Sequence, residues 1–507
     1  MKKITALLAV FVLTLSSCDD FLDVNRDPNN PQFIPLENRL VGAITMTNGA
    51  SMWRAAREIT AVTQYAAAGT AQNGPETWRF TASYFFWQNA YTWAIPNAVD
   101  MVVQGVDEGS PHYAGAGRTL EALNFGMLTD QKGPIVVSEA YNGRSQVNLS
   151  PKFDSQEDVY RLIIEKLDEA IVHFNNPNNR KGLNLAGGDI MYQGDINKWR
   201  RFAYSLKARY LNHLTKKRAY NPDAVLAAVA NAFNGDGMDA EYPYLAGASA
   251  TDANPWSVQG FGGFSSPTAP RYFSFTQFFV DLMKTAPVTN NALLDPRIGI
   301  IMNPAPADGE FRGLIPGQGV PGGVAANGNR YGRVTGGFYS RANSPFPFIT
   351  YSEVKFIEAE ARLRKGGDKA GALAAYQEGV RANMRRLGVP AASIDAYWNA
   401  LVADGVSAHF DNLTTGLSHI MRQKYITQVF NPETWVDMRR MDYSQAIYGP
   451  GLVRPINLNP LFDPNNPNEW IRGMFMEGNE VVRNGANAGD NSPEFRLKGR
   501  LWWDTPD

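Results

Sequence analysis

The sequence predicts a mainly α fold in which tetratricopeptide-like helical hairpins form an α-α superhelix, with a loop-rich lobe that contains short strands. The first reason is the stretch 351–387, where apolar residues recur at helical spacing on either side of Gly366 and Gly367. Such a hairpin cannot bury both of its apolar stripes alone, so it needs neighbouring hairpins. The second reason is the stretch 234–350, where Gly, Pro, Asn and aromatic residues replace that periodicity.

The hairpin has recognisable ends and faces. Val354, Ile357 and Ala361 form the apolar stripe of its first helix. The glycine pair supplies a left-handed stop, and Asp368 is the expected N-cap of the second helix. An ordinary helical hairpin, without further repeats, is the alternative. We expect a solvent-facing stripe made of Ser352, Glu353, Lys355, Glu358, Glu360 and Arg362.

Other stretches repeat the helical pattern. Ser155 and Asp158 resemble a capping box at the start of a long amphipathic helix. Short strands are expected near 331–340 within the loop-rich lobe. The stretch 69–93 is interpreted as an aromatic-rich loop that is followed by a helix through Val102. Helices are also predicted at 36–66, 114–130, 155–174, 198–214, 211–233, 273–283, 419–430 and 435–440.

Size and charge limit the possible functions. The chain has 507 residues, 44% of them apolar, which is enough for a large core. Its formal net charge of -1 argues against nucleic acid as a partner, because phosphate binding needs a basic surface. Aromatic residues make up 12% of the chain, more than a helical scaffold needs, and surplus aromatic residues often lie on binding surfaces.

The N-terminus is typical of an exported lipoprotein. A short basic start and an apolar run of 12 residues, 4–15, predict a signal peptide at 1–17. Cys18, the only cysteine, is the expected lipidation site, and 18–35 is a polar tether before the domain at 36–507. Plain secretion with a chance cysteine is the alternative. No later stretch is apolar for the ~18 residues that a membrane span needs.

The sequence offers no convincing catalytic, cofactor or metal motif, so we do not expect an enzyme. The five histidines have no metal-ligand spacing. The stretch 317–322 matches GxGxxG by letter, but it follows no strand and precedes no helix, so it is interpreted as a loop.

Six segments along the chain form a recognisable set. They are CDDFLDVNRDPNNP, LTDQKGPIVVSEA, GDINKWRRFAYSLKARYLNHL, YSEVKFIEAEARLRKGGDKAGALAAY, QKYITQVFNPETWVDMRRMDY and RLWWD. In this order they resemble the SusD/RagB family of nutrient-binding outer-membrane lipoproteins, and more closely its SusD-like branch. One departure is Gln131-Lys132, where many members have Tyr-Gly.

The resemblance implies a partner and a location. Family members sit as a hinged lid on a SusC-like TonB-dependent transporter, with their helical repeats on the transporter and their loops towards the nutrient. The family belongs to Bacteroidetes, where the acidic pair after Cys18 favours a lipid-anchored position in the outer membrane facing outwards. The implied ligand is an oligosaccharide, with a peptide as the alternative.

Sugar rings stack on aromatic side chains while amides and charged groups take their hydroxyls. For each aromatic residue, core packing is the alternative. The candidate ligand-binding residues are Trp78, Tyr84, Trp87, Trp256, Phe264, Phe338 and Tyr339, with Asn73, Gln88 and Arg341 as polar companions.

Two other classes of protein stay open at this point. A surface glycoside hydrolase or peptidase of the same uptake system would place two acidic residues across a cleft, ~5–9.5 Å apart in a glycosidase. A scaffold that only assembles surface complexes would have no concave aromatic site.

Overall fold

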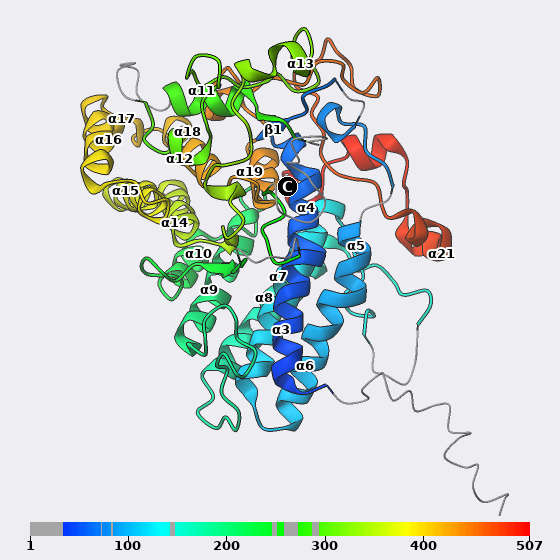
Figure 1. Ribbon diagram of the computed structural model, residues 1–507. Helices are drawn as coiled ribbons and strands as arrows, with labels where there is room; N and C mark the ends of the chain where they lie inside the picture. Colours follow the sequence, from blue (N-terminus) through cyan, green and yellow to red (C-terminus); the bar gives the residue numbers. More distant parts are fainter. Residues whose placement is uncertain are drawn as a thin grey trace, which may run out of the picture.

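The computed structural model describes residues 34–71, 74–82, 85–141, 148–245, 251–257, 272–285 and 294–507. Within these residues the chain is mainly helical, as predicted (Figure 1). The longer helices are α3 (Leu36–Met46), α4 (Trp53–Val62), α6 (Ile95–Asp107), α7 (Pro111–Lys132), α8 (Gln156–Phe174), α9 (Ile196–His213), α10 (Pro222–Val229), α11 (Gln277–Thr285), α14 (Tyr351–Lys365), α15 (Lys369–Arg386), α16 (Ala391–Ala403), α18 (Leu413–Thr427), α19 (Glu433–Arg440) and α21 (Gly478–Ala488).

Shorter elements connect these helices. The short α-helices are α5 (Phe85–Asn89), α12 (Ile298–Ile301), α13 (Val324–Asn327), α17 (Val406–His409) and α20 (Gln445–Tyr448). The π-helical segments are η1 (Thr47–Met52), η3 (Ala90–Ala94) and η6 (Glu494–Lys498). The 3-10 segments are η2 (Pro75–Thr77), η4 (Gly328–Arg330), η5 (Phe338–Ser340) and η7 (Trp502–Asp504). The strands are β1 (Ala66–Ala67), β2 (Ala240–Tyr242), β3 (Ser274–Phe275) and β4 (Phe346–Ile349).

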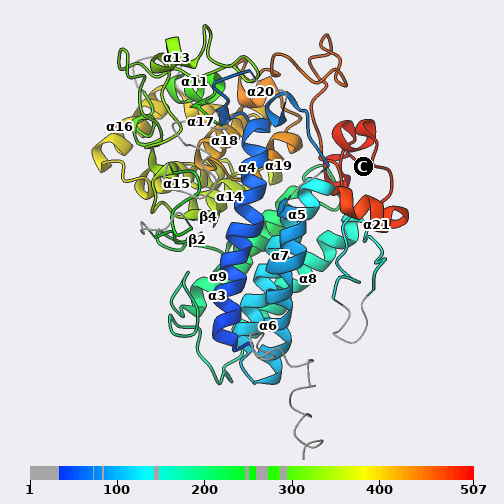
Figure 2. The same ribbon diagram turned by 45° about the vertical axis from the view of Figure 1, so that its right-hand side comes forward.

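The helices stack as neighbouring pairs. α7 packs against α6 and α8, α8 against α9, and α14 against α15, while α10 and α18 pack against α14. Figures 1 and 2 both show α3, α6, α7 and α8 as one bundle. The predicted hairpin is confirmed: Gly366 and Gly367 have positive φ, and Asp368 caps α15 by accepting the N–H of Gly371. The predicted start of α8 is also confirmed, because Ser155 is its N-cap and Ser155 Oγ accepts the N–H of Asp158 at 3.1 Å.

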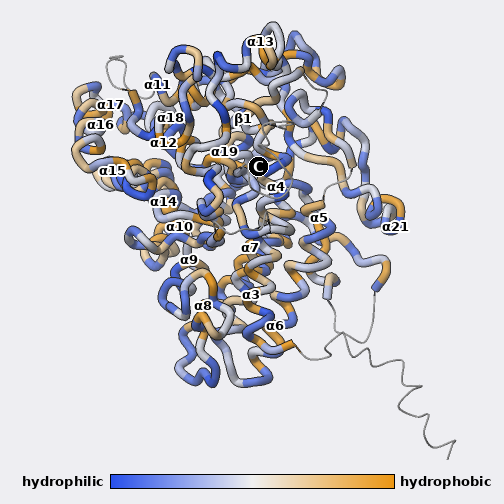
Figure 3. Tube along the Cα trace, viewed as in Figure 1, coloured by the Kyte–Doolittle hydropathy of each residue, from blue (hydrophilic) through white to orange (hydrophobic). Residues whose placement is uncertain are grey.

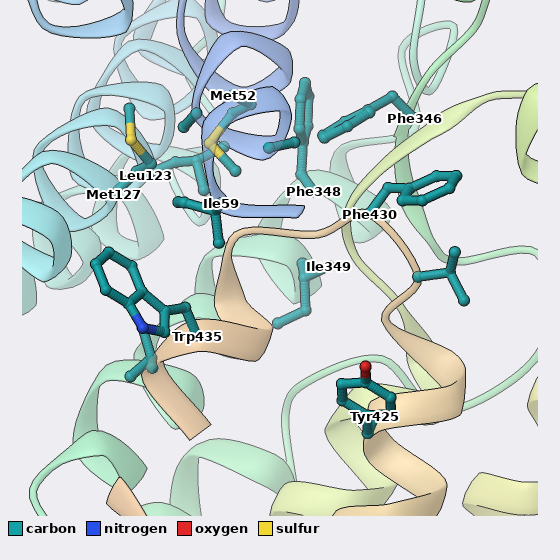
Figure 4. Packing of buried hydrophobic residues seen from close by; sticks show 14 of the residues in the cluster. Met52, Ile59, Leu123, Met127, Phe346, Phe348, Ile349, Tyr425, Phe430 and Trp435 are labelled. Carbon is teal, nitrogen blue, oxygen red and sulfur yellow. The ribbon is translucent and has the colours of Figure 1, made fainter. Parts of the chain in front are cut away.

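One apolar core joins the helical bundle to the later segments. Figure 4 shows Met52, Ile59 and Leu123 of the N-terminal helices close to Phe348 and Trp435, which come from much later in the chain. Along α14 and α15, hydrophobic and hydrophilic residues alternate, as they do in amphipathic helices (Figure 3). The domain is therefore held together by contacts between distant parts of the sequence.

The prediction that one stripe of α14 faces solvent is wrong. Glu353 and Glu360 are 1% and 0% exposed, because α9 and α18 pack against the helix and Arg440 of α19 reaches it. Each carboxylate is neutralised by a buried arginine. Arg209 binds Glu353 at 2.7 and 2.8 Å, and Arg440 binds Glu360 with two contacts of 2.9 Å. Helix α14 therefore buries both of its faces, one apolar and one ionic.

The loop-rich lobe contains short strands, but not where they were expected. β2 pairs antiparallel with β4, and β1 pairs antiparallel with β3. The stretch 331–340 forms turns and η5 instead of strands, because Ser340 Oγ donates to the carbonyl oxygen of Val334 at 2.6 Å and closes a local loop. Helix α11 begins at Gln277, later than predicted, because the preceding residues Ser274–Phe275 form β3.

The predicted signal peptide and Cys18 lie outside the described residues. Among the helices that the structure does describe, none is both long enough and apolar enough to cross a bilayer.

Candidate functional site

A cavity of about 350 Å³ opens between α5, η3 and α21, and we call it the α21 cavity. Figure 2 shows α5 and α21 on the same side of the molecule. Its volume lies in the range of about 300–1,000 Å³ that is common for ligand pockets. The lining residues are Trp87, Gln88, Tyr91, Thr92, Val136, Ala140, Pro151, Glu477, Asn479, Glu480 and Arg483.

The first wall comes from α5 and η3. Trp87, Gln88, Tyr91 and Thr92 are spaced so that they share one side of this continuous helical segment. The rings of Trp87 and Tyr91 lie 4.9 Å apart between centroids, and Phe153 lies parallel to Trp87 at 6.3 Å. Trp87 is only 3% exposed, whereas Gln88 and Thr92 are exposed. This wall therefore combines an aromatic pair with two polar side chains.

The floor is a loop whose shape is fixed by one carboxylate. Asp154 accepts the N–H groups of Val137 and Ser138 at 2.7 and 2.9 Å. The hydroxyl of Tyr91 donates to the carbonyl oxygen of Val136 at 2.7 Å, and the hydroxyl of Tyr141 donates to the carbonyl oxygen of Tyr91 at 2.6 Å. These bonds fasten the floor to the aromatic wall.

Helix α21 forms the opposite wall and is held at both ends. The N–H of Gly478 donates to the carbonyl oxygen of Ala82 at 2.6 Å. Near the other end, Asn484 Nδ2 donates to the carbonyl oxygen of Pro151 at 2.9 Å. Between these anchors, α21 presents Glu480, which is half-buried, together with the exposed Asn479 and Arg483.

The cavity lining carries charges of both signs. Glu477 and Glu480 are acidic and Arg483 is basic. Burial raises the pKa of Tyr91 well above its usual value, and nearby Tyr141 and Glu480 raise it further. The Tyr91 phenol donates its proton to the carbonyl oxygen of Val136, so its ring, and not its hydroxyl, is the part that a ligand would use. Aromatic rings beside amides and charged groups of both signs suit a polyhydroxylated ligand.

Of the candidate residues from the sequence, the structure brings Trp87 and Gln88 together in this cavity. Trp78 is 1% exposed and packs on Phe462 and Trp470, with ring centroids 4.9 and 5.4 Å away. In this conformation its ring is out of reach of a ligand.

Trp256 is 2% exposed, and its ring is stacked on Phe430 with centroids 4.2 Å apart. Core packing therefore accounts for Trp78 and Trp256, and contact of either ring with a ligand would require them to move.

The remaining candidates divide into two groups. Phe338 is half-buried and Arg341 exposed, with the guanidinium 5.9 Å from the ring, while Tyr339 is buried and donates to the carbonyl oxygen of Thr427 at 3.2 Å. None of these three lines the α21 cavity. The others, Asn73, Tyr84 and Phe264, lie outside the described residues. Ligand binding by both groups stays a prediction.

Sequence reasoning missed most of the cavity. Tyr91 could have been found, because it follows Trp87 by four residues on the same helical face. Asn479, Glu480 and Arg483 carried no local signal, since they come from a polar helix almost 400 residues away from α5.

A buried cluster elsewhere contains three residues of metal-ligating type. In the described part of the chain, Asp130, His213 and Glu433 have ligand atoms within 4.8 Å of one another. His213 Nε2 lies 2.7 Å from Glu433, and its Nδ1 lies 2.9 Å from the hydroxyl of Tyr160. Both ring nitrogens are therefore engaged, and Arg209 lies 3.7 Å from Glu433. We interpret the cluster as a structural hydrogen-bond network.

Comparison with protein families gives one match that spans most of the chain. The model of the SusD-like family, described as "Starch-binding associating with outer membrane", matches residues 32–451. No curated protein sequence matches the chain.

Solved structures show the same fold at low sequence identity. A chitin-binding SusD homolog from Flavobacterium johnsoniae matches with a TM-score of 0.74 at 17% identity, covering 93% of this chain and 99% of the other. A SusD homolog from Bacteroides fragilis NCTC 9343 matches with a TM-score of 0.71 at 17% identity, covering 94% of this chain and 100% of the other. A SusD/RagB family protein from Bacteroides thetaiotaomicron VPI-5482 matches with a TM-score of 0.68 at 21% identity, covering 94% of this chain and 100% of the other.

Proposed function

The chain belongs to the SusD-like family, and from that premise we propose that it binds a glycan in the α21 cavity. The observation that carries the proposal is the packing of Trp87 against Tyr91 beside Gln88, Glu480 and Arg483. The aromatic surface that a sugar ring would meet is mainly the half-buried Tyr91, with Trp87, 3% exposed, packed against it, and the polar groups around the pair reach the ring hydroxyls. The described starch and chitin binding of the family and of a structural relative supports the same ligand class.

The proposed role is capture and delivery at the cell surface. Cys18 would carry the lipid that anchors the protein to the outer membrane, and a SusC-like TonB-dependent transporter would receive the glycan. The family description, which names association with the outer membrane, supports this location. The protein would do no covalent chemistry itself, and the transporter would supply the energy for uptake.

The arrangement of carboxylates argues against a glycosidase at this cavity. A glycosidase needs two carboxyl groups that flank the scissile bond from opposite sides, ~5–9.5 Å apart. The carboxylates that line the cavity, Glu477 and Glu480, are three residues apart at the start of α21 and belong to the same wall. The family match is also to a binding family and not to a catalytic one.

Isothermal titration calorimetry against a panel of neutral oligosaccharides and peptides tests the proposal. For an oligosaccharide that binds, we expect Trp87→Ala to weaken binding by at least tenfold, because the aromatic wall of the cavity loses its larger ring and the sugar loses that stacking surface. Trp93→Ala is the matched control, because Trp93 is 48% exposed on the same helical segment but does not line the cavity. Equal affinity of wild type and folded Trp87→Ala, or binding of peptides alone, would overturn the proposal.

A further inference from the structure

A second cavity, of about 280 Å³, lies at the start of α8 and is lined by the C-terminal segment. We call it the α8 cavity. It shares no lining residue with the α21 cavity. Its walls combine the side chains of Phe495, Leu501 and Trp502 with the charged residues Arg496 and Glu157. It is therefore a separate, chemically distinct pocket that the proposed glycan site does not use.

Arg496 is the unusual member of this lining. It is 6% exposed, and its described hydrogen bonds go only to carbonyl oxygens, from Nη1 to Lys132 at 3.3 Å and from Nη2 to Ala488 at 2.7 Å. Its Nε is buried without a hydrogen-bond partner in the described structure. A buried guanidinium is stable when a carboxylate offsets its charge. Here Asp490 acts on it only at longer range.

The other two cations in the lining, Arg500 and Lys132, already have partners. Arg500 pairs with Asp442 at 2.7 Å and with Asp504 at 3.3 Å. Lys132 donates to the carbonyl oxygen of Phe475, and the charge of Glu477 stabilises its ammonium group. Arg496 is thus the charge in this lining that an incoming anion would balance.

The start of α8 adds a second attraction for an anion. α8 has 19 residues, and the first N–H groups of a helix have no partner within the helix. Ser155 satisfies one of them, the N–H of Asp158, and the N–H groups of Gln156 and Glu157 belong to the same first turn. The Glu157 side chain opposes this attraction, because it is exposed, lines the cavity and forms no ion pair with a described residue.

Aromatic and apolar groups complete the pocket. Phe495 is 53% exposed, and the Arg496 guanidinium lies 5.3 Å from its ring centroid. Trp502 is half-buried, and the ammonium nitrogen of Lys217 lies 5.0 Å from its ring centroid. A flat ring fits such walls, and a carboxylate on that ring would meet Arg496.

From these contacts we propose that the α8 cavity binds a small ring-bearing carboxylate, with Arg496 holding the carboxylate and Phe495 and Trp502 holding the ring. Two kinds of molecule share this chemistry, an acidic sugar and an aromatic acid. A volume of about 280 Å³ admits a single ring.

Calorimetry with two matched probe pairs tests this proposal on the full-length protein: glucuronate against glucose, and benzoate against benzyl alcohol. We expect at least one acid to bind at least tenfold more tightly than its neutral partner, and the tighter acid identifies the source of the ring. Arg496→Gln should weaken binding of that acid by at least tenfold, because a charge-assisted hydrogen bond is lost. Trp87→Ala should leave the affinity for the acid unchanged, which separates this site from the proposed glycan site.

A second variant decides the matter if Arg496→Gln does not fold. Glu157→Gln removes an exposed negative charge from the cavity, so it should tighten binding of the acid at least twofold. Glu165→Gln, which removes an exposed charge from the same helix outside the cavity, should have no effect. Acids bound no better than their neutral partners, unchanged binding in folded Arg496→Gln, or no tightening in Glu157→Gln would overturn the proposal.

Discussion

Arg209 and Glu353 form a bidentate ion pair in the core, with Nε–Oε1 at 2.7 Å and Nη2–Oε2 at 2.8 Å. The two side chains are 3% and 1% exposed. Arg209 belongs to α9 and Glu353 to α14, so the pair joins two helical hairpins that are 144 residues apart in sequence. Nη2 of Arg209 also donates to the carbonyl oxygen of Phe348 at 2.7 Å, so β4 is attached to the same ion pair.

Removing one partner of this pair should be costly. Arg209→Met leaves the Glu353 carboxylate buried without its cation, which typically costs roughly 3–5 kcal/mol. Chemical denaturation with circular dichroism measures this loss in the free energy of unfolding. Lys365→Met is the matched control, because Lys365 pairs with Asp223 across α14 and α10 at 2.6 Å, with both side chains largely exposed. A loss as small in Arg209→Met as in this control would contradict the account.

The second buried pair predicts sensitivity to acid. Burial acts to raise the pKa of Glu360, but the charges of Arg440 and Arg364 outweigh burial and hold that pKa well below its ordinary value of 4.5. The folded state therefore favours ionised Glu360, so its contribution to stability is present above pH 4.5 and is lost as the pH falls below it. Denaturation curves from pH 6 to pH 3 should show this decline.

Glu360→Gln should flatten that decline, since the variant has no carboxylate to titrate at this position. Glu165→Gln, on the exposed side of α8, should leave the decline as in the wild type. The same slope in Glu360→Gln and wild type would show that another group is responsible.

Replacing Trp78 should lower the stability of the folded protein rather than remove a direct contact with the ligand. Trp78 is one of the candidate ligand-binding residues from the sequence. Its ring is buried between Phe462 and Trp470, so Trp78→Ala should cost roughly 3–5 kcal/mol by opening a cavity. Differential scanning calorimetry should show a clear drop in melting temperature. Trp93→Ala serves as the exposed tryptophan control, and an unchanged melting temperature for Trp78→Ala would refute the packing role.

The lipid anchor is tested independently of the fold. Cys18→Ala removes the thiol on which the predicted acylation depends, and we expect the variant to leave the outer-membrane fraction. Membrane fractionation followed by immunoblotting measures the distribution. Cys18→Ala protein that stays in the membrane fraction would rule out lipidation as the anchor.

The sequence was sufficient where capping and turn residues gave a local signal. The glycine pair Gly366–Gly367 and the cap Asp368 specify the α14–α15 hairpin within a few residues, and Ser155 with Asp158 specifies the start of α8. These interactions depend on neighbours along the chain, so periodicity and capping chemistry reveal them.

Tertiary partners decided what the sequence could not show. Glu360 resembled a surface residue because its partner, Arg440, lies 80 residues later. Trp78, with Gly, Pro and Asn nearby, resembled an exposed loop residue, but Phe462 and Trp470 cover it. The four residues that α21 and its N-cap contribute to the cavity could not be predicted for the same reason, since α21 carries no local sign that it faces α5.

A crystal structure with the tightest-binding oligosaccharide from the glycan panel tests the central claim most directly. We predict a sugar ring in the α21 cavity, in contact with Trp87 or Tyr91 and within hydrogen-bond distance of Gln88, Glu480 or Arg483. An oligosaccharide bound at another place, with the α21 cavity left free, would contradict the account.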